Sequence, residues 1–146
     1  MQLKRGRTMN VTRFVLAVIV AYVVMAVLAI GLEALLGDMT SSFKALHRPE
    51  EALAEYQIWM YLAYLLQTVV FCYIFTLNYE NKGWMEGLRY GLLIGLFMSF
   101  EVMAWYGMMP IAGMDTVVTM IMTVVIYMGG GIATALVYKP AAQPMA

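Results

Sequence analysis

Four long apolar runs, separated by polar segments, divide the chain. Residues 14–32 form a nearly unbroken apolar stretch, and three similar stretches follow between residues 56 and 138. A transmembrane helix needs about 20 consecutive apolar residues, and each run is long enough. We therefore predict an all-α, polytopic membrane protein with a single domain, residues 1–146. Its four transmembrane helices, at about residues 14–35, 56–77, 84–109 and 116–138, form an antiparallel bundle, and residues 36–55 form an external loop.

The first run follows a basic segment that contains Lys4, Arg5 and Arg7. A basic start before an apolar run is also typical of a secretory signal, whose apolar region has roughly 7–15 residues. This run is longer and reaches the length that spans a bilayer. We favour a retained first helix over a cleaved signal.

Local signals place the helix ends. Pro49 followed by Glu50 and Glu51 is a good helix start, because proline fits the first turn and acids suit its positive dipole end. The second helix is expected to begin near Pro49, outside the bilayer. At the start of the third helix, Glu86 and Arg89 are three residues apart and can pair across one turn. Arg89 could instead extend its side chain to a lipid phosphate.

The distribution of basic residues predicts the orientation. With four spans, seven of the nine Lys and Arg residues fall on one side and only Lys44 and Arg48 on the other. Because cytoplasmic loops carry an excess of Lys and Arg, both termini are expected in the cytoplasm. The seven residues on that side are Lys4, Arg5, Arg7, Arg13, Lys82, Arg89 and Lys139.

Composition narrows the function classes. The chain is 63% hydrophobic and 12% charged with zero net charge, so the lipid bilayer is the expected environment and nothing attracts nucleic acid. One histidine, His47, and one cysteine, Cys72, do not make a usual metal or haem site within the chain. The 15 methionines could bind copper(I), but methionine more often fills gaps in apolar cores. We predict no cofactor, no metal and no catalytic residue.

Small residues recur every fourth position in the third helix. Such a series lets another helix approach closely in lipid, either within the chain or between copies. A bulky residue at Gly91 or Gly95 is expected to disrupt this contact. The helix-packing series consists of Gly83, Gly87, Gly91, Gly95 and Ser99.

Glu101 is an ionisable residue inside an apolar run, which makes it a candidate functional site. At 1.5 Å per residue it lies at the level of Tyr64 in the second helix and Thr123 in the fourth. We predict a buried intramembrane polar cluster of Glu101, Tyr64 and Thr123, with Gln67 and Thr119 nearby. Such residues can also serve only as hydrogen-bonding partners between helices, and both interpretations stay open for Glu101.

Several segments resemble small bacterial four-helix membrane proteins of unknown function. The likeness lies in Tyr73-Ile74-Phe75-Thr76, Gly83, Glu86-Gly87-Leu88-Arg89-Tyr90-Gly91, Gly95, Gly131 and Tyr138-Lys139-Pro140. It covers about half of the chain and rests on glycines and aromatic residues. The resemblance implies four helices and a bacterial inner membrane, and it implies no activity.

Two functions agree with these patterns. The first is a non-enzymatic packing or assembly partner, which associates with itself or with a larger membrane complex through the glycine face. The absence of a nucleophile–base pair, phosphate loop or metal set in the sequence favours it. The alternative is a small proton- or cation-coupled transporter that uses Glu101. An enzyme that acts on lipid at the outer face ranks third.

Overall fold

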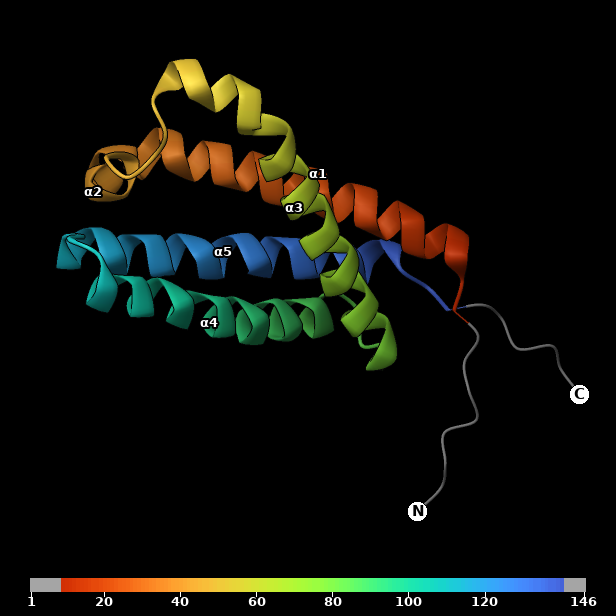
Figure 1. The fold of residues 1–146 in the computed structure, drawn as a ribbon. Coiled ribbons are helices and arrows are strands. Elements are labelled where there is room, and N and C mark those ends of the chain that lie inside the picture. The colour runs from red at the N-terminus through yellow and green to blue at the C-terminus, as the bar shows by residue number, and fades with distance from the viewer. Residues whose placement is uncertain (1–8, 141–146) are drawn as a thin grey trace, which may run out of the picture.

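The computed structural model describes residues 9–140, except for the side chain of Glu50, and this part is helical without any strand (Figure 1). Four of its helices are long and apolar enough to cross a membrane, which confirms the predicted all-α chain with four candidate spans. The elements are α1 (Val11–Leu36), η1 (Gly37–Thr40), α2 (Ser41–Lys44), α3 (Glu50–Leu77), α4 (Trp84–Met108) and α5 (Gly113–Val137).

Helix ends follow local capping. Helix α1 begins at Val11 because the Asn10 side chain accepts a hydrogen bond from the Arg13 N–H at 3.1 Å. Helix α3 begins directly after Pro49, so the segment predicted as loop 36–55 contains η1, α2 and the first turns of α3. Three of the basic residues used for orientation, Lys4, Arg5 and Arg7, lie outside the described residues.

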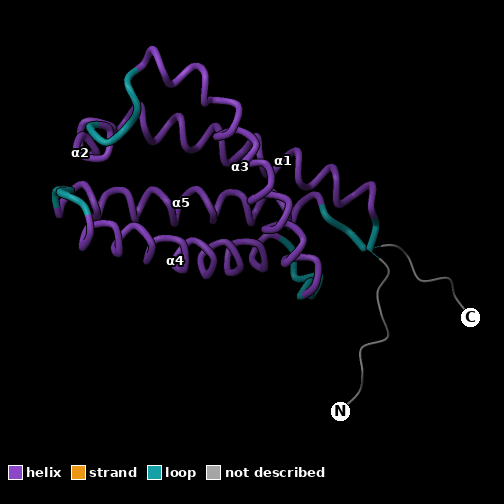
Figure 2. The backbone as a smooth tube through the Cα atoms, viewed as in Figure 1, coloured by secondary structure: helices purple, strands orange, loops and turns teal. Residues whose placement is uncertain are grey.

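Helix α5 is the centre of the fold. It lies between α1 and α4 in one layer, and α3 crosses this layer at an angle (Figures 1 and 2). The main contacts of α3 are with α1, and few of its residues approach α5. The predicted antiparallel bundle of four helices is therefore not shown, because α3 crosses the other three instead of lying along them.

The glycine series brings the backbones of α4 and α5 together. A Cβ atom added at Gly87 would lie 2.1 Å from the carbonyl oxygen of Gly131, and one at Gly91 would lie 2.3 Å from that of Tyr127. Gly95 faces Val124 in the same way, so the two helices run antiparallel. Residues four positions apart form a row on the helix surface that is inclined to the helix axis. A second helix that crosses along this row contacts each small residue in it. The glycine face is thus occupied within the chain.

The two ends of the series differ from each other. Ser99 is 1% exposed, and its hydroxyl donates to the Leu96 carbonyl at 2.8 Å. Gly83, in contrast, does not pack against any helix. It is the N-cap of α4 with φ of 72°, and a Cβ there would meet nothing within 4 Å. Its inclusion in the packing series was wrong, because glycine is needed there for the left-handed backbone of the turn.

A glycine triplet lets α5 pack on two sides. Gly131 faces Gly87 of α4, whereas a Cβ at Gly129 or Gly130 would overlap Leu28 or Met25 of α1. Three consecutive small residues point in different directions around a helix, since each turns by about 100°. This is why α5 can serve as the middle helix of the layer.

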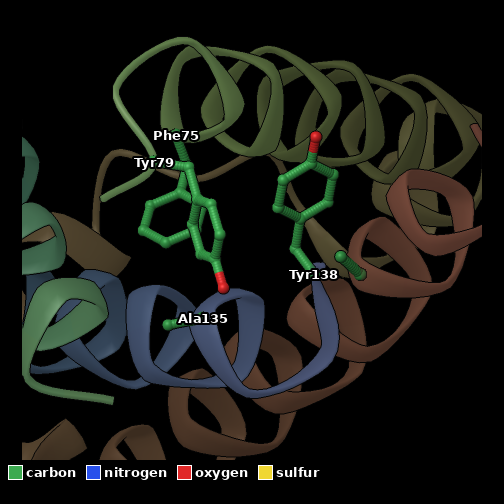
Figure 3. Packing of buried hydrophobic residues seen from close by; sticks show 5 residues of the cluster. Phe75, Tyr79, Ala135 and Tyr138 are labelled. Atoms are coloured by element: carbon green, nitrogen blue, oxygen red, sulfur yellow. The ribbon is translucent and has the colours of Figure 1, made fainter. Parts of the chain in front are cut away.

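Aromatic side chains attach the last third of α3 to the layer. The Tyr90 hydroxyl donates to the Phe71 carbonyl at 2.5 Å, and the ring centroids of Phe71 and Tyr90 are 4.7 Å apart. Phe75 of α3 and Tyr79 of the turn that follows it extend towards α5, where Ala135 lies beneath them (Figure 3). Edge-to-face and tilted ring pairs add to the apolar burial of such a cluster. Helix α3 is therefore held firmly at this end.

The turn between α3 and α4 is organised by Glu86. Its side chain is 6% exposed, and its two carboxylate oxygens accept the N–H groups of Glu80 at 2.6 Å and Lys82 at 2.9 Å. The expected pair of Glu86 with Arg89 is not formed, since Arg89 instead lies 3.9 Å from the Glu80 carboxylate. The Glu86 carboxylate points back to the turn that precedes α4, because the N–H groups there lie outside the helix and need acceptors.

Candidate ligand cavity

A cavity of about 610 Å³ lies between α3 and the other three long helices. This volume is within the range of pockets that take small ligands, roughly 300–1,000 Å³. Most of the lining side chains are apolar or aromatic. The lining residues are Tyr22, Met25, Ala26, Ala29 and Ile30 of α1; Met60, Tyr61, Tyr64, Gln67 and Thr68 of α3; Met98, Glu101, Val102 and Trp105 of α4; and Thr119, Thr123, Ile126 and Tyr127 of α5.

The cavity exists because α3 is attached along only part of its length. From Thr68 onward, a buried residue recurs every three or four positions on α3. Between residues 53 and 66, by contrast, every α3 residue is exposed. The Thr68 hydroxyl donates to the Tyr64 carbonyl at 2.8 Å, at the level where this change occurs. Helix α3 therefore leaves the layer at that point and opens the space beside it.

All five members of the predicted polar cluster line this one cavity. Glu101 projects from α4, Tyr64 and Gln67 from α3, and Thr119 and Thr123 from α5. The cluster is not sealed, however: Glu101 is exposed and Tyr64 is 54% exposed. The prediction that these two are buried was wrong, because the divergence of α3 leaves the space between them open.

Glu101 has a distinctive position in the wall. It is the one acidic residue among the described lining residues, which include no Lys, Arg or His. The hydrogen bonds and ion pairs of the described part of the chain do not include its carboxylate. A carboxylate can accept several hydrogen bonds, so this capacity is open to a ligand.

The two threonines of the cluster behave differently. Thr123 donates its hydroxyl to the Thr119 carbonyl at 2.8 Å, one turn earlier on the same helix. The Thr119 hydroxyl oxygen is buried and, among the described residues, has no hydrogen-bond partner. A buried hydroxyl without a partner costs about 1–3 kcal/mol, so a ligand that bonded it would relieve that cost.

Sequence reasoning missed the contribution of α1 and most of the aromatic wall. Tyr22, Tyr61, Trp105 and Tyr127 all line the cavity, but none was included in the predicted cluster. For Tyr22 a signal was present, since it is the one side chain with a hydroxyl in the run 14–32. The other three share helix faces with Glu101, Tyr64 and Thr123, yet aromatic residues alone do not indicate a cavity.

A second polar contact, also missed, lies at the end of α5 remote from the aromatic cluster. The Ser42 N–H and hydroxyl both donate to Asp115 Oδ2, at 2.8 and 2.7 Å, and the Ala112 N–H donates to Ser42 Oγ at 3.2 Å. We call Ser42, Ala112 and Asp115 the latch. It fixes α2 to the turn between α4 and α5, where the positive end of α5 favours the carboxylate.

Replacing Asp115 with asparagine is expected to loosen the latch. The neutral amide is a weaker acceptor than the carboxylate for the two bonds from Ser42. Hydrogen exchange of amides in residues 41–46 should accelerate by about tenfold, while amides of α4 near Gly91 keep their protection. Asp38→Asn, the same change on an exposed acid of η1, is the control. Equal exchange in all three proteins would contradict a stabilising latch.

The cavity wall brings groups of several chemical kinds together. It combines one carboxylate, several hydroxyls, an amide and aromatic faces. In the described part of the chain, no three His, Cys, Asp or Glu side chains are grouped so as to hold a metal ion. Cys72 is buried outside the cavity lining and shares a hydrogen bond with Thr134 at 3.5 Å. The wall therefore offers groups that orient a bound molecule.

Comparisons of the chain with protein-family models, with curated proteins and with solved structures found no match. The arguments for function therefore come from the cavity and from the packing around it.

Proposed function

We propose that this chain is a non-enzymatic, multi-pass membrane protein that binds a small, largely apolar molecule in the cavity between α3 and the other helices. The observation that carries the proposal is the convergence of polar side chains from four helices on one cavity in an otherwise apolar protein. Buried or membrane-embedded polar groups are costly, and their concentration at one place is typical of a binding site.

The occupied glycine face argues for ligand binding over assembly through that face. Gly87, Gly91 and Gly95 are covered by α5 of the same chain, so a partner helix has no access to them. A role as a small subunit remains a second candidate because residues 53–66 of α3 are exposed throughout. A partner on that segment would protect it. Detergent-solubilised complexes that leave α3 amides as exchangeable as in the purified chain would argue against this candidate.

The membrane placement is part of the proposal. Four consecutive spans alternate in direction, and the excess of Lys and Arg on one side favours cytoplasmic termini. A bacterial inner membrane is the proposed location, in line with the resemblance described above. In this placement Glu101 lies in the half of the bilayer farther from the cytoplasm. If the bound molecule is also transported, Glu101 is the group that would couple its passage to a proton or cation.

Fluorescence of Trp105 tests binding directly. Trp105 lines the cavity, whereas the other two tryptophans, Trp59 and Trp84, do not. In a W59F/W84F protein, 1-bromonaphthalene, a neutral apolar quencher, is expected to quench Trp105 with a saturable dependence on concentration. A W84F/W105F protein, which keeps only the exposed Trp59, should show linear collisional quenching.

A cavity-filling variant makes the test specific. Ala29 lines the cavity, and Ala29→Phe should reduce saturable quenching of Trp105 at least tenfold in apparent affinity, because the added ring occupies the binding volume. Ala63→Phe, the same change on an exposed residue outside the lining, should leave it unchanged. Linear quenching of Trp105 in the protein that keeps Ala29, or saturable quenching that Ala29→Phe leaves unchanged, would overturn the proposed function.

A further inference from the structure

The charge pattern of the cavity indicates its ligand class more narrowly than its volume does. Among the described lining residues, one acid is present and no Lys, Arg or His. A bound anion would meet an uncompensated carboxylate at close range, which is unfavourable in a site of low dielectric. A bound cation would meet a single opposite charge. Charge complementarity therefore favours a monocation.

Aromatic side chains strengthen this preference. Tyr22, Tyr61, Tyr64, Trp105 and Tyr127 line the cavity from all four long helices. The face of an aromatic ring attracts a cation within about 6 Å of its centre, most strongly when both are shielded from water. Aromatic cages of this kind bind organic ammonium groups in proteins of many folds. An anion would gain nothing from these faces.

The remaining lining residues indicate what the uncharged part of the ligand must be like. Methionine, alanine, isoleucine and valine make up nearly half of the lining residues, so the ligand must present an apolar surface. A Ca²⁺ or Mg²⁺ ion fits poorly, because its sites are built mainly from carboxylate and carbonyl oxygens, and the lining side chains supply one carboxylate and one amide carbonyl. Methionine also adapts to ligands of different shape. A compact cation with an apolar or aromatic body matches all of these features.

We propose that the cavity selects lipophilic organic cations, with the Glu101 carboxylate facing the positive charge and the aromatic side chains around it. This inference rests on the proposed function, since it names the ligand class of the same cavity. Because α3 leaves the layer beside the cavity, such a molecule reaches Glu101 from the side, out of the lipid, and need not pass between packed helices.

Two probes of the same shape and opposite charge separate the ligand classes. Tetraphenylphosphonium and tetraphenylborate are titrated into the full-length W59F/W84F protein in a neutral detergent, with Trp105 fluorescence as the signal. Tetraphenylphosphonium is expected to bind saturably and at least tenfold more tightly than tetraphenylborate. Equal affinity for the two probes, or preference for the anion, would overturn the inference.

Variants of Glu101 identify the responsible group. In the same background, Glu101→Gln should weaken tetraphenylphosphonium binding about tenfold or more, while Glu101→Asp keeps most of the affinity because it keeps the charge. Glu55→Gln, the same change on an exposed acid outside the cavity, should have no effect. Unchanged affinity in Glu101→Gln would overturn the role of Glu101. If Glu101→Gln fails to fold, as judged by circular dichroism, the comparison of the two probes decides.

The outcomes keep the two proposals apart. Saturable quenching by neutral 1-bromonaphthalene without preference for tetraphenylphosphonium would leave the binding function in place and reject the cationic ligand class. Linear behaviour with all three probes would reject both. Saturable binding of the cation, reduced in Glu101→Gln and in Ala29→Phe, would support both at once.

Discussion

Replacing Gly91 with valine is expected to prevent stable packing of α4 on α5 and to lower the free energy of unfolding by at least about 3 kcal/mol. The first added carbon would already lie 2.3 Å from the Tyr127 carbonyl oxygen and 2.7 Å from the Met128 Cα. Both are backbone atoms of a helix, so neither can move aside without separating the helices. Unfolding in detergent by a denaturing co-surfactant, followed by circular dichroism, measures the loss.

The control for this change lies in the same helix. A Cβ at Gly107 meets nothing within 4 Å, so Gly107→Val should change stability by less than about 0.5 kcal/mol. Since the contact is within the chain, the defect in Gly91→Val should not depend on protein concentration. Stability equal to that of Gly107→Val, or a defect that appears only on dilution, would show that the glycines do not join α4 to α5 in this way.

Replacing Glu86 with alanine is expected to lower stability by about 2–4 kcal/mol, because two backbone N–H groups lose a charged acceptor. Hydrogen bonds to charged groups contribute about 1.5–3 kcal/mol each, and Glu86 accepts those of Glu80 and Lys82. Glu86→Gln keeps one acceptor oxygen and should lose about half as much. The same unfolding measurement applies, with hydrogen exchange of residues 78–83 as a local readout.

Glu51 provides the matched control for Glu86. It is also an acid in the first turn of a long helix, so it makes the same favourable interaction with the helix dipole. Its side chain is exposed, however. If Glu51→Ala destabilised the protein as much as Glu86→Ala, the effect would come from the helix dipole and not from the turn.

Hydropathy and helix rise predicted much of the candidate site. Runs of about 20 apolar residues give the number of long helices, and a rise of 1.5 Å per residue placed Glu101, Tyr64 and Thr123 at one level. These three residues line one cavity, together with Gln67 and Thr119 of the predicted cluster. Their exposure was not predictable from level alone, because it depends on the angle at which α3 crosses the other helices.

Other features had no local signal strong enough to find them. Asp115 follows a short turn, and its sequence context indicates a solvated acid. In the structure, however, it accepts hydrogen bonds from Ser42, which lies 73 residues earlier in the chain. Glu86 seemed placed to pair with Arg89, but its carboxylate instead accepts the N–H groups of Glu80 and Lys82 in the preceding turn. In both cases a backbone N–H is among the donors, and sequence does not show which backbone N–H groups need an acceptor.

The sequence by itself determined the four apolar helices, the small residues that permit close contact, and the level of Glu101 along its helix. These properties depend on local composition and on helix geometry, which are the same in any tertiary arrangement. Tertiary structure alone decided that α5 covers the glycine face of α4, that the part of α3 before its aromatic attachment stands away from the layer, and that a cavity forms beside Glu101. These depend on how distant side chains fit together, and a small residue permits close packing without specifying its partner.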